Sequence, residues 1–107
     1  MPNSFKIEFN IQVPISELFS KLTAVESIGK LRKSEVQTDQ RRILFINPPT
    51  WIRQGQNVLV FLFDNEKGGT RIVVNSSCCT VSQLFDFGQN QKNCIAVRDQ
   101  IYLLLKP

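Results

Sequence analysis

The chain has 107 residues, 42% of them hydrophobic and 21% charged, and its formal net charge is +4. This composition is typical of a globular protein and excludes a disordered chain, while the length allows one core but not two ordinary domains. No apolar run reaches the roughly 18 to 20 residues of a membrane helix, so no membrane span is expected. We therefore expect residues 1–107 to form a single domain.

Two features predict a cytoplasmic location. The opening stretch MPNSFKIEFN lacks the basic region and the apolar stretch of a secretory signal. The cysteines number 3, and two of them, Cys78 and Cys79, are adjacent and would point to opposite faces of a strand. We expect free thiols in a reducing compartment and no disulfide framework.

The first elements predicted in chain order are a strand and a helix. Over residues 5–13, FKIEFNIQV alternates strictly between apolar and polar side chains, which is typical of a strand with one face in water. Pro14 suits the first turn of a helix, and in the following ISELFSKL the apolar side chains recur at the spacing of an amphipathic helix. A second helical piece is expected to reach Ile28, before Gly29 ends it.

A run of strands is predicted next, and a helix after it. EVQTDQRRILFI indicates two short strands around a turn at Asp39 and Gln40, and NPPT indicates another turn. NVLVFLFDN is typical of a central strand, NEKGGT of a hairpin connection, and TRIVVNSSCCTV of the next strand, with a short strand expected to run to Phe85. Helical spacing returns from Gln89 to Leu105, so the order is strand, one or two helices, about four to six antiparallel strands and a final helix. Helices segregated from an antiparallel sheet define the α+β class.

The two ends of the chain carry a resemblance to a known superfamily. FNIQVPISELFSKLTAVESIG, a strand followed by a short helix marked by proline, resembles the opening of the START-like superfamily, also called Bet v 1-like or SRPBCC. VVNSSCCTVSQLFDFGQNQKNCIAVRDQIYLLL resembles the ends of some compact bacterial proteins of unknown function, with Asp-x-Gly-x-Asn at Asp86, Gly88 and Asn90. The resemblance implies a helix-grip fold, in which an antiparallel sheet curls around a C-terminal helix. It also implies a site for a small hydrophobic ligand between sheet and helix.

Asp86-Phe87-Gly88 is also the triplet that holds magnesium in protein kinases. A kinase needs in addition a Gly-rich phosphate loop, a lysine–glutamate pair and an Asp-Asn catalytic loop, and the sequence contains none of them. In the structural interpretation, which we favour, Asp86 or Asn90 caps the last helix and Gly88 takes the tight turn before it.

Other catalytic chemistry finds no support. The chain has 0 histidines, which excludes the usual Ser-His-Asp and Cys-His mechanisms and most zinc sites. Its 9 carboxylates are scattered, with no pair placed for acid–base work. Cys94, near a helix N-terminus, is a candidate reactive thiol, but burial as a small apolar residue is the favoured alternative. We predict no metal, no cofactor and no catalytic activity, although catalysis is unsupported rather than excluded.

One cluster of charge suggests a possible anion site. The basic residues of this cluster are Lys30, Arg32, Lys33, Arg41 and Arg42. Such a cluster can hold phosphates, a nucleic-acid backbone or an acidic partner. Glu35 and Asp39 interrupt it, and no aromatic residue lies among the basic ones to stack on bases. A solvated surface is therefore the favoured interpretation, and nucleic-acid binding ranks last.

Aromatic residues suggest a ligand pocket or a filled core. Those expected on facing elements, or beside the proline pair, are Phe9, Phe19, Trp51, Phe61, Phe63 and Tyr102. An apolar pocket is lined in this way, and so is a filled core. The filled core is favoured because a chain of this size leaves little spare volume.

The stretch NVLVFLF is apolar on both faces, whereas the first strand is apolar on one. If helices cover one side of the sheet, either Leu59, Phe61 and Phe63 or the alternate set must pack against something else. An exposed apolar sheet surface commonly marks an interface, so we expect a homodimer through this region. The prediction is a binding or interaction protein, with a carrier of a small hydrophobic ligand as the alternative.

Overall fold

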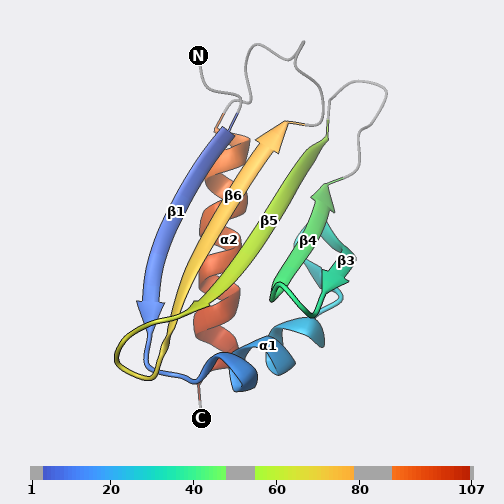
Figure 1. Ribbon diagram of the computed structural model, residues 1–107. Coiled ribbons are helices and arrows are strands. Elements are labelled where there is room, and N and C mark those ends of the chain that lie inside the picture. The colour runs from blue at the N-terminus through green and yellow to red at the C-terminus, as the bar shows by residue number, and fades with distance from the viewer. Residues whose placement is uncertain (1–3, 48–54, 79–87, 107) are drawn as a thin grey trace.

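The computed structural model describes residues 4–47, 55–78 and 88–106. Within these ranges the chain forms six strands and two helices in an α+β order, as predicted (Figure 1). The elements are β1 (Ser4–Ile11), α1 (Ile15–Thr23), β2 (Ser27–Ile28), β3 (Leu31–Gln37), β4 (Arg42–Asn47), β5 (Gln56–Asp64), β6 (Thr70–Cys78) and α2 (Gln89–Leu104). The expected short strand up to Phe85 lies outside the described residues.

The six strands form one antiparallel sheet with the order β1-β6-β5-β4-β3-β2. The strands from β2 to β6 pair with their neighbours in sequence, but β1 pairs with β6, so that Ser4 lies opposite Ser77. Figure 1 shows the sheet curled along α2, with α1 crossing near one end. This is the helix-grip arrangement that the resemblance implied.

The first strand and helix form where the sequence pattern places them. Along β1 the polar side chains are exposed, and Ile11 at the end of the strand is buried. Pro14 stands at the N-cap of α1 with φ −58°, the angle that its ring imposes. Leu18 and Leu22 on the apolar stripe of α1 are fully buried. Packing of this stripe against the sheet stabilises a helix too short to persist alone.

The expected second helical piece up to Ile28 is wrong. After α1 the chain turns into the short strand β2, which pairs with β3 through Ile28 and Leu31. Gly29 has φ +60°, which suits the tight turn between the two strands. Ile28 is buried as a strand residue, so its apolar character did not distinguish a helix from a strand.

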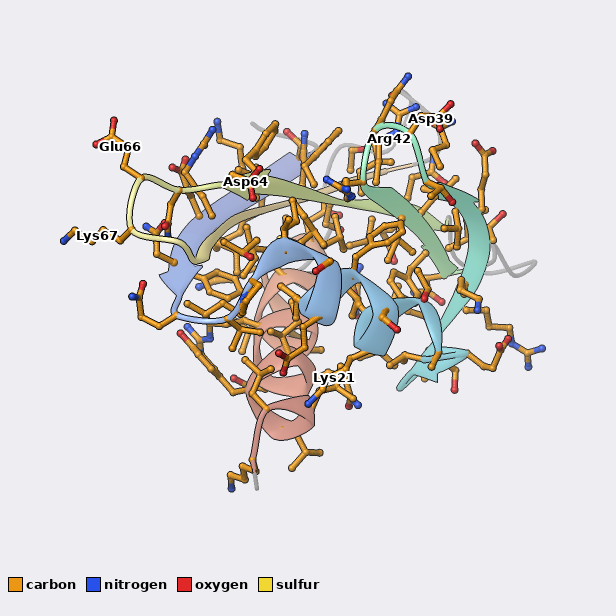
Figure 2. The ribbon with its side chains drawn as sticks, turned by 60° about the horizontal axis from the view of Figure 1, so that its bottom comes forward. Lys21, Asp39, Arg42, Asp64, Glu66 and Lys67 are labelled. Atoms are coloured by element: carbon orange, nitrogen blue, oxygen red, sulfur yellow. The ribbon has the colours of Figure 1, made fainter. Side chains whose placement is uncertain are left out.

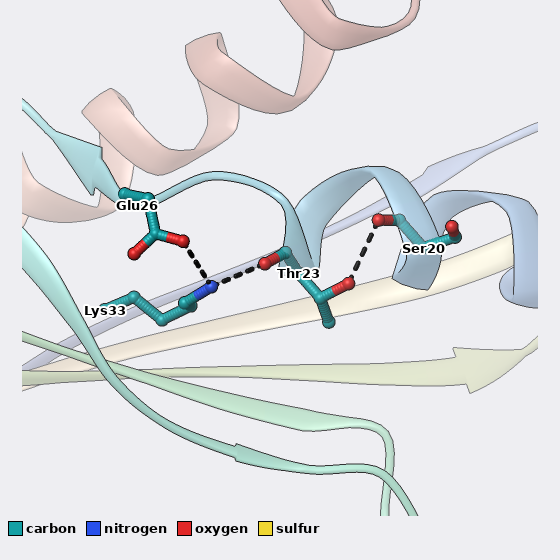
Figure 3. A network of polar contacts seen from close by, with 4 residues as sticks. All are labelled: Ser20, Thr23, Glu26 and Lys33. Carbon is teal, nitrogen blue, oxygen red and sulfur yellow. Dashed lines mark hydrogen bonds and ion pairs between the residues drawn. The ribbon is translucent and has the colours of Figure 1, made fainter.

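Lys33 fixes the bend between α1 and β2. Its Nζ donates to the backbone oxygen of Thr23 at 2.6 Å and to Oε2 of Glu26 at 3.0 Å, as Figure 3 shows. The hydroxyl of Thr23 donates in turn to the backbone oxygen of Ser20 at 3.0 Å. The bond to Thr23 satisfies a carbonyl at the helix end that has no partner within the helix, and a cation is favourable there.

The core lies between the sheet and the two helices. Its fully buried apolar side chains are Leu18, Leu22, Ile43, Phe45, Val58, Val60, Ile72, Val74, Cys94, Val97 and Ile101. Figure 2 shows side chains throughout the layer between the sheet and the helices. On β5 it is therefore the set Val58, Val60 and Leu62 that faces the helices. In the described ranges neither helix is long and apolar enough to cross a membrane.

Candidate functional site

The face of the sheet that points away from the helices, here called the outer face, carries at least three rows of side chains that run across five strands, among them the two through Leu59 and Phe61. The strand registers place Glu35, Leu44, Leu59, Asn75 and Lys6 in one row and Gln37, Arg42, Phe61, Val73 and Glu8 in the next, from β3 to β1. Figure 2 shows Arg42 on the side of the sheet opposite α1 and α2. Neither helix covers these rows.

An apolar stripe occupies the middle of the outer face. This outer stripe consists of Leu44, Leu59, Phe61, Phe63 and Val73. The rings of Phe61 and Phe63 stack with centroids 6.4 Å apart. Phe63 is 41% exposed, and the other four are partly exposed. Contiguous apolar side chains on an uncovered sheet face make the outer stripe a candidate interaction surface.

Charged side chains border the outer stripe. The guanidinium carbon of Arg42 lies 5.9 Å from the ring centroid of Phe61, and that of Arg71 lies 4.5 Å from Phe63. Arg71 also pairs with Glu8, Nη1 to Oε2, at 3.1 Å. Arg42 also lines a shallow hollow of about 270 Å³. The other residues that line it are Glu35, Gln37, Leu44 and Leu59. An apolar centre with arginines at its border is the usual composition of a protein–protein interface.

The described aromatic residues among those proposed for a ligand pocket do not all come together. Phe9 and Tyr102 pack against each other with centroids 5.7 Å apart, and Phe19 packs at the edge of the core. Phe61 and Phe63 lie on the outer face, because their sequence neighbours Val60 and Leu62 point inward. Trp51 lies outside the described residues.

A buried polar cluster joins the start of α2 to β6. The hydroxyl of Ser76 donates to Oδ1 of Asn90 at 2.7 Å and accepts from Nδ2 of Asn93 at 3.2 Å. Oδ1 of Asn93 accepts from Nε2 of Gln89 at 2.8 Å. These hydrogen bonds offset the cost of burying amides in the core. In the sequence the signal for this cluster is the serine that follows Ile72 and Val74 at inward positions of β6.

Two neighbouring strands carry a second buried polar contact. Nδ2 of Asn47 donates to Oε1 of Gln56 at 2.7 Å, and both residues are buried. They lie opposite each other in the β4–β5 register. The inner face of the sheet is therefore apolar along most of its length and polar at the end where β4 and β6 finish.

The start of α2 differs from the predicted cap. Gly88 is the N-cap residue with φ +76°, as a tight turn requires, and its position provides no side-chain cap. Asn90 lies inside the first turn of the helix, where its amide oxygen accepts a hydrogen bond from Ser76, and the N-cap position itself is Gly88 rather than Asn90. Asp86 lies outside the described residues.

Cys94 is a buried thiol on the inner side of α2. Desolvation raises the pKa of Cys94 from 9.0 to about 11, against a smaller lowering by a backbone hydrogen bond from Ser76. Its Sγ donates to the backbone oxygen of Phe5 at 3.3 Å, which requires the protonated form. This environment is the opposite of one that activates a cysteine.

The basic cluster is divided among different surfaces. Lys33 is engaged by the end of α1, and Arg42 lies over Phe61 on the outer face. Arg41 occupies the β3–β4 turn with φ +51°, while Lys30 and Arg32 are exposed near the β2–β3 turn. Among the described residues there is also no group of three acidic, histidine or cysteine side chains that could hold a metal ion.

Comparison with known proteins bears on the fold. No protein-family model matches the sequence, and no curated protein matches it either. The crystal structure of Ara h 8.0201, a Bet v 1 family allergen, is similar with a TM-score of 0.67 over 94% of this chain and 93% of that chain. The fold is Bet v 1-like. At 10% sequence identity the similarity establishes the architecture and not a shared ligand or activity.

The Ser76→Ala substitution should destabilise the protein. It leaves buried amide groups of Asn90 and Asn93 without the hydroxyl, so we expect the free energy of unfolding to fall by about 1–3 kcal/mol. Ser77→Ala, one residue further on and on the outer face, is the matched control, with an expected change below about 0.5 kcal/mol. Urea denaturation measures both, and equal effects would contradict a role for the buried cluster.

Cys94 should resist alkylation in the folded protein. At neutral pH we expect the peptide that contains Cys94 to stay unmodified by iodoacetamide and to react fully in denaturant, as measured by mass spectrometry. Because the folded pKa is about 11 and the unfolded value is 9.0, the folded state holds the proton more tightly. This contribution to stability is complete below pH 9.0 and is lost as the pH rises to about 11. Rapid alkylation at neutral pH would show that the thiol is accessible.

Proposed function

We propose that this chain is an interaction protein that works as a homodimer through the outer face of its sheet. The observation that carries the proposal is the outer stripe, which leaves five neighbouring apolar side chains partly in water. Burial of such side chains stabilises a complex by about 25 cal/mol per Å² of apolar surface removed from water. A second copy presents the same stripe, so one surface serves both partners.

The proposal assigns no catalytic step to the protein. Among the described residues, the titratable side chain with a clearly shifted pKa is Cys94, and its shift is toward the unreactive thiol. The outer face offers hydrogen-bonding and charged groups at its border and apolar groups at its centre. We also propose that the chain is one domain and acts in the cytoplasm, where a free thiol such as Cys94 persists.

A second candidate function is that of a carrier for a small hydrophobic ligand. Bet v 1-like folds commonly bind such ligands between sheet and helix, and here the inner face combines apolar side chains with a polar end. This would be the usual arrangement of an apolar pocket with a few orienting polar groups. Anion or nucleic-acid binding ranks last, because the basic residues are divided among surfaces.

The Leu59→Lys substitution should disrupt the homodimer. It places a charge in the middle of the outer stripe, so we expect the dissociation constant to rise by at least about 30-fold without loss of secondary structure. Sedimentation over a series of concentrations measures the constant. The control is Leu103→Lys, which changes a 58% exposed leucine on α2 and should leave the constant unchanged. A wild-type protein that stays monomeric at tens of micromolar would refute the homodimer.

The carrier hypothesis makes a separate prediction for the protein as purified. Native mass spectrometry should then show a retained small apolar compound of constant mass, which organic extraction removes. If the protein instead carries no extra mass and retains no hydrophobic probe such as a fluorescent fatty acid, the carrier hypothesis fails and the interaction protein stands alone.

A further inference from the structure

The charges on the outer face are arranged unequally on the two sides of the outer stripe. In the row through Leu59, the β3 end carries Glu35 and the β1 end carries Lys6. Both side chains are exposed. This row therefore has a negative charge on β3 and a positive charge on β1. Each of these strands lies two positions from β5 in the sheet, on opposite sides of it.

This arrangement is complementary to itself under one kind of symmetry. A two-fold axis that lies between two outer faces and runs along β5 exchanges the β3 and β1 sides of the sheet. It sets each row against the same row of the partner in reverse order. Glu35 of one protomer then lies opposite the partner's Lys6, and the β5 part of the outer stripe, Leu59, Phe61 and Phe63, lies against itself. Leu44 lies opposite the partner's Asn75, and Val73 lies opposite the partner's Arg42.

We propose that a second copy of this chain binds the outer face about a two-fold axis along β5, with Glu35 and Lys6 as the groups that select it. The inference rests on the proposed homodimer and adds the partner's orientation to it. Two sheets packed in this way lie about 10 Å apart, and their mean strand directions agree to within about 30°. Pairs at the border of such an interface determine orientation and partner choice more than affinity.

The neighbouring row agrees with the same axis. It begins with Gln37 on β3 and ends with Glu8 on β1, so an amide donor of one protomer lies opposite a carboxylate of the other. Gln37 Nε2 now donates to Glu35, and Glu8 pairs with Arg71. All of these groups lie at the exposed border, where side chains can exchange partners without entering a dry environment.

Two of the axes that run across the strands fit the charges less well. An axis along the row through Leu59 sets Glu35 against Glu35 and Lys6 against Lys6. An axis along the neighbouring row sets Arg42 against the partner's Arg42 and Glu8 against the partner's Glu8. Like charges opposite each other disfavour both arrangements. An axis between the two rows also pairs opposite charges, since it sets Lys6 of each protomer against the partner's Glu8 and Glu35 against the partner's Gln37. The reversal Glu35→Lys distinguishes this axis from the one along β5, because about the axis between the rows it creates no repulsive pair.

The experiment uses two charge reversals, alone, mixed and combined. Glu35→Lys gives each protomer two positive charges at the paired positions, and Lys6→Glu gives it two negative ones. Each variant alone should self-associate about tenfold more weakly than the wild type, because both border pairs of its dimer become repulsive. When the two variants are mixed, every border pair joins opposite charges again, so heterodimers should form in preference to both homodimers.

Native mass spectrometry with one variant labelled by a heavy nitrogen isotope separates the three dimers by mass. The control mixture is Lys92→Glu with Glu66→Lys, two exposed positions away from the outer face, and it should assort at random. A chain that carries both Glu35→Lys and Lys6→Glu should return to within about threefold of the wild-type dissociation constant.

The outcomes separate the inference from the function on which it rests. If the wild type is monomeric, the homodimer itself fails. If the wild type is a dimer but the mixed variants assort at random, the homodimer stands and the axis along β5 is wrong. Preferential heterodimers together with recovery in the combined variant support both.

Discussion

Two helices cover one face of the sheet, and this single constraint decides the role of almost every side chain on the strands. Successive residues of a strand point to opposite faces, so each strand divides its residues between the core and the outer face. On β1 the outer set is polar, which suits contact with water. On β5 the outer set includes Leu59, Phe61 and Phe63, whose apolar side chains do not suit contact with water. The difference between these two strands is the strongest physical reason to expect a partner.

Polar contacts hold the covering layer in place. Lys33 joins the end of α1 to β3, and the hydrogen bonds around Ser76 join the start of α2 to β6. Both contacts lie where a helix end leaves backbone groups without partners inside the helix. Apolar packing alone would allow the helices to slide, since the hydrophobic effect has no direction. Directional contacts at the helix ends fix their positions on the sheet.

Local patterns predicted much of the fold, and the limits of the prediction have physical causes. The strict alternation before Pro14 and the helical spacing after it determined β1 and α1, because each pattern is complete within one element. The stretch NVLVFLF showed a strand but not which of its faces meets the helices, because both sets of side chains are apolar. The β2 strand was missed because two residues are too few to show a period.

The candidate site was less predictable than the fold. The two rows through Leu59 and Phe61 on the outer face exist only through the registers of five strands, which no local pattern specifies. Likewise the contact between Ser76 and Asn90 joins residues on separate elements. Sequence reasoning found the apolar surface on β5 but placed Phe61 and Phe63 with Phe9 and Tyr102, from which the sheet separates them.

The pairing of β1 with β6 also affects the order in which the protein can fold during synthesis. Ser4 lies opposite Ser77, so β1 cannot pair with its neighbouring strand until the chain has been synthesised as far as β6. Until then the apolar side of β1 has neither a neighbouring strand nor α2 to cover it. Closure of so long a segment is entropically costly, and uncovered strands are prone to associate with other chains. In a nascent chain of this fold, the apolar side of β1 therefore stays uncovered until β6 and α2 have been synthesised.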